Sequence, residues 1–202
     1  MKLGRKYMKE MKIILASKSP RRREFLEKLG IDFDIIPAVN PEDMKAFRNI
    51  KKLSKVLGEQ KAQEVFNKTE GNRTVIGSDS MVYVKGKLFG KPQNEDEGRQ
   101  MLKSLSGNWH KVITSLCVII EKNGERKFYS KVFVVKVKFM KLTDNMINNY
   151  LATGEYSDKA GSYAIQGLSS KFIECIKGDY SSIVGLPYCE LYKILNKEGI
   201  IE

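Results

Sequence analysis

The sequence has few of the residues that build disulfide frameworks and zinc sites. The 202 residues include only three cysteines and a single histidine. Cys117, Cys175 and Cys189 lie far apart without a CxxC pair, which excludes a disulfide scaffold and a cysteine-based zinc site. The single histidine, His110, cannot form a two-histidine metal site, and a lone histidine is more often structural than catalytic. We therefore expect a reducing, cytoplasmic environment, with Cys117 buried as a small core residue.

Long apolar runs are also absent. None approaches the ~18–20 residues that cross a bilayer, and the longest, such as 116–120, have the length of a strand. Residues 1–10 are basic and lack the apolar segment of a secretory signal. Neither GxxxxGK[ST] nor GxGxxG occurs, which disfavours P-loop and Rossmann chemistry. We expect no membrane partner, a flexible extension over 1–10 and a single domain over 11–202.

The chain carries an excess of positive charge, with a formal net charge of +12. Such a balance can indicate a nucleic-acid-binding protein. The lysines are nevertheless scattered and mixed with 24 acidic residues, and only Arg21, Arg22 and Arg23 form a tight basic cluster. We expect a lysine-rich solvated surface and no specific nucleic-acid partner. A weak preference for phosphate or a polyanion is the alternative interpretation.

The hydrophobic pattern predicts an α/β fold with a mixed, twisted sheet and flanking helices. It opens with a β-α-β unit, and Asn123-Gly124 and Lys85-Gly86 mark two hairpins. The expected strands are 12–16, 33–36, 74–84 interrupted at 77–80, 110–120, 127–139, a turn and strand over 161–167, and 171–176. The expected helices are 21–29, 50–66 with Gly58 weakening its continuity, 94–105 with Asn94 as its cap, a capped helix over 143–151, one from 181, and 187–196.

The first chemical clue is the helix start Ser19-Pro20-Arg21-Arg22-Arg23. A helix N-terminus carries partial positive charge and prefers acidic residues, so three arginines there oppose the dipole and repel one another. The violation makes sense if the site receives an anion, because the backbone N–H groups, the dipole and the guanidinium groups all favour one. Ser17 and Ser19 add two hydroxyls, and a polyphosphate would fit. A solvent-facing basic turn is the other interpretation.

The second clue is Gly77-Ser78-Asp79-Ser80 inside an apolar strand. Asp is depleted in strands, and a buried carboxylate is costly unless it is bonded or binds a metal. Asp79 could ligate Mg²⁺ or take a proton from water. An aspartate in a turn between two strands is the alternative.

Three further residues give weak signals. Lys91, in Gly90-Lys91-Pro92, could reach a phosphate as a point charge, although a surface loop is the simpler interpretation. Glu42 could be a second metal-binding carboxylate, and composition makes Asp43 an equal candidate. Lys61 lies on a predicted helix, where a solvated lysine is the default.

Taken in order, several short segments resemble the Maf family of nucleotide pyrophosphatases. They cover roughly residues 11 to 200, and each is weak alone, but the ordered set is highly specific. The segments are Leu15-Ala16-Ser17-Lys18-Ser19-Pro20-Arg21-Arg22, Lys61-Ala62, Gly77-Ser78-Asp79, Gly90-Lys91-Pro92, His110-Lys111-Val112-Ile113-Thr114, Asp158-Lys159-Ala160-Gly161-Ser162-Tyr163-Ala164-Ile165-Gln166-Gly167, Gly178-Asp179-Tyr180 and Gly185-Leu186-Pro187.

The resemblance implies an elongated α/β catalytic domain with a cleft between two lobes, related to the inosine triphosphate pyrophosphatases. It also implies a nucleoside triphosphate substrate, a divalent cation, Mg²⁺ or Mn²⁺, and often a homodimer. Asp79 matches the proton acceptor and, with Glu42, would hold the cation. Arg21, Arg22, Lys61 and Lys91 match other polar active-site positions, while the segment 37–46 around Glu42 departs from the acidic run usual there.

The motif ending in Ile165-Gln166-Gly167 resembles the branch that hydrolyses dTTP and UTP to the monophosphate and pyrophosphate. Arg21, Ser80 and Gln166 match positions tied to base specificity, and Ser80 replaces the more usual threonine while keeping the hydroxyl. The alternative is a regulator of cell division that acts by binding partners, since Maf relatives are linked to inhibition of septum formation.

Overall fold

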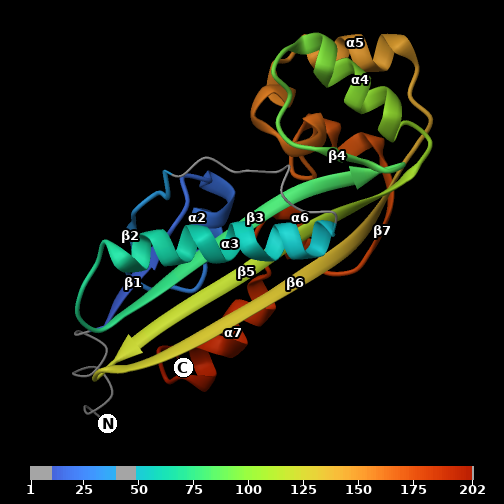
Figure 1. Ribbon diagram of the computed structural model, residues 1–202. Helices are drawn as coiled ribbons and strands as arrows, with labels where there is room; N and C mark the ends of the chain where they lie inside the picture. Colours follow the sequence, from blue (N-terminus) through green and yellow to red (C-terminus); the bar gives the residue numbers. More distant parts are fainter. Residues whose placement is uncertain (1–10, 40–48, 202) are drawn as a thin grey trace. The chain divides into compact units, whose positions relative to one another are not determined.

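The computed structural model describes residues 11–39 and 49–201 (Figure 1). The expected extension over 1–10 and the candidate ligand Glu42 lie outside these ranges. The chain divides into two compact units. Unit 1 comprises Met1–Asp79, Thr114–Val132 and Gly185–Glu202, and unit 2 comprises Ser80–Ile113 and Phe133–Val184. The predicted cleft between lobes stays a prediction, as does the single domain over 11–202.

The strands form a mixed sheet in the order β2-β1-β3-β5-β6-β7, with β4 paired to β3. β1 is parallel to both β2 and β3, as the predicted β-α-β unit requires. β4 is antiparallel to β3, and β7 is antiparallel to β6. The strands are β1 Lys12–Leu15, β2 Asp34–Ile35, β3 Arg73–Val84, β4 Lys87–Phe89, β5 Trp109–Lys122, β6 Glu125–Phe139 and β7 Ile173–Lys177.

Six α-helices and three short 3-10 segments flank these strands in the described residues, so the predicted α/β class is confirmed. None of the helices in the described part of the chain has the length and apolarity needed to span a bilayer. The helices are α2 Pro20–Glu27, α3 Ile50–Asn67, α4 Glu95–Leu105, α5 Asp144–Leu151, α6 Tyr180–Val184 and α7 Tyr188–Lys197, with η1 Glu155–Asp158, η2 Ala160–Ser162 and η3 Leu168–Phe172.

The longest helix, α3, helps to form the core of unit 1. α3 packs against β1, β3 and β5, as Figure 1 shows for α3 and β3. The buried cluster joining them is Ile14, Ala16, Ala62, Val65, Phe66, Val75, Cys117 and Ile119. Cys117 is therefore the small core residue that was predicted, and burial raises the pKa of its thiol to about 12.

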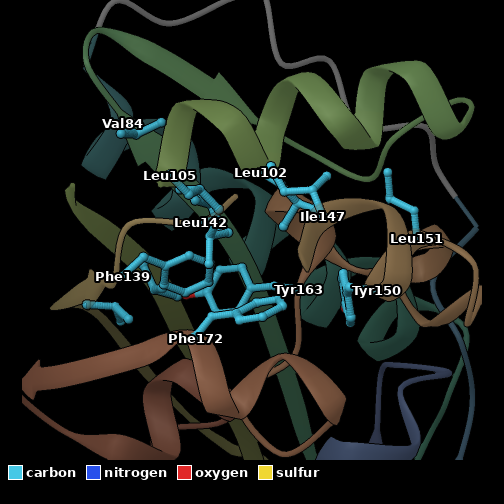
Figure 2. Close-up of a cluster of buried hydrophobic side chains, with 13 residues drawn as sticks. Val84, Leu102, Leu105, Phe139, Leu142, Ile147, Tyr150, Leu151, Tyr163 and Phe172 are labelled. Carbon is cyan, nitrogen blue, oxygen red and sulfur yellow. The ribbon is translucent and has the colours of Figure 1, made fainter. Parts of the chain in front are cut away.

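Unit 2 has its own core, built between α4, α5 and the ends of β3, β5 and β6 (Figure 2). Aromatic rings dominate its centre, where the Phe139 ring packs edge-on against Tyr163 and Phe172. Tyr150 and Leu151 of α5 complete it from the helix side. The apolar stripe that predicted these helices is thus the surface that they bury.

Local turn and capping signals are confirmed at most element ends. Lys85-Gly86 and Asn123-Gly124 adopt the left-handed backbone of two-residue hairpins, with φ values of 47°, 83°, 54° and 83°. Asn94 caps α4 by accepting from the N–H of Glu97, and the hydroxyl of Thr143 caps α5. These features depend on neighbours in sequence, so the sequence predicts them well.

Two predictions of local structure are wrong. β3 runs without the predicted interruption at 77–80, because partners in unit 1 satisfy its polar groups. The predicted helix over 50–66 is confirmed, and α3 is continuous through Gly58, which packs against β5. The segment 161–167 forms turns instead of a turn and strand, and Gly161, at φ 70°, begins it in the left-handed region.

Candidate active site

The centre of the candidate site is a carboxylate buried in the middle of a strand. Asp79 lies in β3 with only 5% of its surface exposed. The Nζ atom of Lys61, on α3, lies 2.6 Å from Asp79 Oδ1. The lysine side chain retains 20% exposure, so the pair reaches solvent from the lysine side. This ion pair stabilises a charged carboxylate where an isolated one would be costly.

Two glycines bring α3 close enough for Lys61 to reach Asp79. A Cβ atom added at Gly77 would lie 2.6 Å from the carbonyl oxygen of Gly58 and 2.8 Å from Ala62 Cβ. A Cβ atom at Gly58 would lie 2.3 Å from Ser115 Oγ. Because residues three and four apart share a helix face, the helix turn that meets the sheet at Gly58 also presents Lys61 and Ala62 to it.

Two serines hold the backbone around Asp79. The N–H of Asp79 donates to Ser115 Oγ on β5 at 3.2 Å. The Ser78 hydroxyl lies 2.7 Å from the carbonyl oxygen of Ser115 and 2.8 Å from that of Gly185. Its single hydrogen is shared between these two acceptors. The polar residues that break the apolar pattern of β3 are therefore each bonded across unit 1.

The start of α2 forms a second group of polar atoms in unit 1. Arg22 donates from Nε to the carbonyl oxygen of Gly185 at 2.9 Å and from Nη1 to Ser17 Oγ at 2.9 Å. Ser17 Oγ also accepts from the N–H of Ser19 at 3.2 Å. Because Ser17 accepts twice, its own hydrogen is oriented to donate elsewhere. Gly185 connects this group to β3 through Ser78.

The three arginines of α2 differ in their surroundings. Arg23 forms an exposed ion pair with Glu27 on the helix surface. Arg21 is half-buried and makes no hydrogen bond or ion pair within residues 11–39 and 49–201. Ser19 occupies the N-cap position, but its side chain makes no capping hydrogen bond. The helix dipole, Arg21 and the Ser17 hydroxyl are thus arranged for an anion.

Unit 2 holds the predicted residues Ser80, Lys91 and Gln166. The exposed Lys91 lies in a loop whose Gly90 carbonyl oxygen accepts from the N–H of Gly161 at 2.9 Å. Gly161 packs against Val82, where a Cβ atom would lie 3.0 Å from the valine side chain. The exposed Gln166 lies five residues further along the same segment. Two motifs of the sequence analysis are therefore joined within unit 2.

His110 is a structural residue, as expected for a lone histidine. It is 2% exposed, and its Nε2 atom lies 2.8 Å from the Tyr163 hydroxyl. Burial lowers the pKa of His110 to about 4 and raises that of Tyr163. The histidine is therefore neutral at physiological pH and packs among aromatic rings.

A metal site complete within the protein is not found in the described part of the chain. No group of three or more His, Cys, Asp or Glu residues there is placed to hold an ion. Among the described residues, Asp79 alone supplies a buried carboxylate beside polar backbone. This donor set suits Mg²⁺, which protein sites often bind through one or two carboxylates, water and substrate phosphates.

Comparison with known protein families shows which family the chain belongs to. The family model described as Maf-like protein matches residues 12–198. The chain belongs to the Maf family.

Several similar proteins are named dTTP/UTP pyrophosphatase. A dTTP/UTP pyrophosphatase of Thermoanaerobacter sp. (strain X514) is 43% identical over 188 residues, which cover 93% of this chain and 97% of the relative. Its counterpart in Pyrococcus horikoshii is 45% identical over 177 residues, covering 88% and 91%. That of Aquifex aeolicus is 38% identical over 191 residues, covering 95% and 97%. Among solved structures, a HAM1 protein from Coxiella burnetii has a TM-score of 0.49 at 11% identity, covering 93% of this chain and 99% of that one.

The structure places six of the residues predicted from Maf motifs in unit 1 and adds three others. Unit 1 contains Ser17, Ser19, Arg21 and Arg22 around the start of α2, and the Lys61–Asp79 pair on α3 and β3.

Ser78, Ser115 and Gly185 were not predicted as site residues. Ser115 directly follows the motif that ends at Thr114. Thr114 and Ser115 are two adjacent, fully buried polar residues in an apolar strand, a pattern that could have indicated a site residue. Gly185 acts through its backbone oxygen, which no side-chain pattern indicates. Ser80 follows Asp79 on β3 and is half-buried, so the strand directs the two side chains to opposite faces.

Proposed function

We propose that this Maf protein hydrolyses dTTP and UTP, and modified pyrimidine nucleotides, to the nucleoside monophosphate and pyrophosphate. The observation that carries the proposal is the buried Asp79–Lys61 pair, held by Ser115 and connected through Ser78 and Gly185 to the Arg22–Ser17 group. The substrate assignment is supported by relatives with 38–45% identity that are named dTTP/UTP pyrophosphatases.

In the proposed reaction, water attacks the α-phosphorus of the triphosphate. A new P–O bond forms while the bond from the α-phosphorus to its bridging oxygen breaks, and pyrophosphate leaves with that oxygen. Asp79 accepts the proton of the attacking water. Arg21, Ser17 and the start of α2 bind phosphate oxygens, and Lys61 and Lys91 offset the charge of the leaving pyrophosphate. Ser19 fixes Ser17 through its backbone N–H.

The reaction is proposed to use Mg²⁺ or Mn²⁺ held by Asp79 together with Glu42. When bound, the cation would neutralise phosphate charge and favour departure of pyrophosphate. Gln166 is assigned to recognition of the nucleobase, because its amide can both donate to and accept from a pyrimidine edge. Arg21 and Ser80 are also assigned to selection of the nucleobase, because their positions match Maf positions tied to base specificity.

The proposal predicts that Asp79→Asn loses most activity. Removing the proton acceptor should lower the rate about 10²–10⁴-fold, and further if the cation is also lost. The measurement is pyrophosphate release from a panel of nucleoside triphosphates with Mg²⁺, Mn²⁺ or EDTA. Asp34→Asn is the matched control, since it makes the same change at an exposed carboxylate of unit 1.

Near-normal turnover by Asp79→Asn would contradict the assigned role. If the folded wild-type protein cleaved no nucleotide, the proposed enzymatic function would fail. A role in binding partners during cell division would then be the hypothesis to test.

A further inference from the structure

The turn that carries Gln166 is held by a carboxylate from a distant part of unit 2. The N–H of Gly167 donates to the carbonyl oxygen of Ala164 at 3.0 Å, so residues 164–167 form a β-turn. Gln166 occupies its third position and is exposed. The direction of the Gln166 side chain therefore depends on what fixes the two ends of this turn.

Glu155 contacts the turn at its C-terminal end. Its Oε2 atom accepts from the N–H of Leu168 at 2.8 Å. Its Oε1 atom accepts from the hydroxyl of Tyr150 at 3.0 Å, and Tyr150 lies in α5 with 2% of its surface exposed. The carboxylate thus connects the backbone beyond Gln166 to a residue of the unit 2 core (Figure 2).

The surrounding residues leave the turn little freedom. A Cβ atom at Gly167 would lie 2.3 Å from Glu155 Oε1, so the carboxylate packs directly against the glycine backbone. The fully buried Ser169 accepts from the N–H of Ala164 at 2.9 Å, and its Oγ atom lies 3.5 Å from Glu155 Oε1. Both ends of the turn are therefore bound to the same small group of side chains.

We propose that Glu155 is a positioning residue for nucleotide selection, fixing the turn that presents Gln166 to the base. The inference rests on the proposed function, because it takes Gln166 as the residue that reads the pyrimidine. Thymine and cytosine present opposite hydrogen-bonding groups at position 4, an acceptor and a donor. A fixed amide distinguishes them, whereas an amide on a loose turn can adapt to either.

The test uses Glu155→Gln, which keeps the side chain's size. A carboxylate accepts at both oxygens, whereas a glutamine amide accepts at one atom and donates from the other. In the variant, either the Leu168 N–H faces an NH₂ group, or the Tyr150 hydroxyl accepts from that NH₂ group and its own hydrogen loses the carboxylate that accepted it. We expect the ratio of kcat/KM for dTTP over dCTP to fall by about tenfold, the effect of one lost hydrogen bond, while kcat for dTTP changes much less.

A second substitution provides a rescue. Tyr150→Phe removes the hydroxyl and its hydrogen, so in Glu155→Gln the amide oxygen can accept from the Leu168 N–H without a hydroxyl hydrogen losing its acceptor. The double variant should regain most of the dTTP preference lost in Glu155→Gln. A purely destabilising effect would instead grow worse when both changes are combined. Glu95→Gln is the control, because it alters an exposed carboxylate of α4 that pairs with Arg99.

Hydrogen exchange at the amide of Leu168 supplies a readout that does not need activity. We expect exchange about tenfold faster in Glu155→Gln than in the wild type, and slower again in the double variant. Unchanged exchange would overturn the anchoring contact. Unchanged dTTP preference in an active Glu155→Gln variant would overturn the selection role, whereas a wild-type protein inactive on every nucleotide would instead overturn the proposed function.

Discussion

The charge state of a buried polar residue in this protein depends on the groups that contact it. Asp79 and His110 are both almost fully buried, at 5% and 2% exposure. Asp79 has a lysine 2.6 Å away and a backbone hydrogen bond to Ser115, which support a charged group. His110 has a tyrosine hydroxyl and aromatic rings, which support a neutral one. The two residues therefore differ in charge state because their neighbours differ.

His110 should make stability depend on pH. Its pKa is lowered from 6.5 to about 4 in the folded protein, so the unfolded chain binds this proton first as pH falls. The stabilisation is fully present above about pH 6.5 and is lost as pH falls towards 4, amounting to about 3 kcal/mol. Urea unfolding of the wild type and of His110→Gln between pH 4 and 7 measures it.

The variant lacks the only histidine, so carboxylate titration is common to both proteins. The difference in unfolding free energy between them should shrink as the solution is made more acidic. A constant difference across this range would contradict the assignment.

At the residue scale, the sequence indicates candidate site residues where a residue violates a local preference. Asp79 in an apolar strand and arginines at a helix start were both visible in the sequence. Their partners were not, because Ser115 is 36 residues from Asp79 and Gly185 is 163 residues from Arg22. Such contacts depend on the tertiary fold, which a local pattern does not encode.

At the scale of elements, the contact between α3 and β3 depends on glycine. Gly77→Ala should force the helix away, because the added methyl group would meet backbone atoms of Gly58 and Ala62. We expect a loss of about 1–3 kcal/mol in stability and a loss of pyrophosphate release, since Lys61 moves with the helix. Thermal unfolding and pyrophosphate release measure the two effects.

Gly199→Ala is the control for this substitution. Gly199 has open space around its Cα atom but a φ of 62°, so alanine there costs stability through backbone strain alone. It should retain activity. Full activity in a folded Gly77→Ala variant would show that the close approach of α3 is unnecessary for the site.

The same scale shows where element prediction works. Hairpin turns and helix caps were predicted because each depends on a few adjacent residues. The interruption expected in β3 and the strand expected over 161–167 were wrong, since remote contacts decide both. In the second case the turns are fixed by Gly90 and Ser169, which lie outside the segment.

For the whole molecule, the net charge of +12 should influence substrate capture. A nucleoside triphosphate is strongly anionic, and a positive protein attracts it over a distance that salt shortens. We expect kcat/KM for dTTP to fall by up to about tenfold as ionic strength is raised, while kcat at saturating substrate changes little. Titration with two different salts separates screening from specific ion binding, and a kcat/KM independent of both would contradict the prediction.

One connection in unit 1 has an evolutionary consequence. The carbonyl oxygen of Gly185 accepts from both Ser78 and Arg22, so the link between strand and helix runs through main chain. Substitution cannot delete this oxygen, and natural variation reaches it only by altering the path of the loop. With φ at 127°, that path favours glycine. Selection on this link therefore acts on the shape of the backbone, and a comparison of side chains between relatives would record only the glycine.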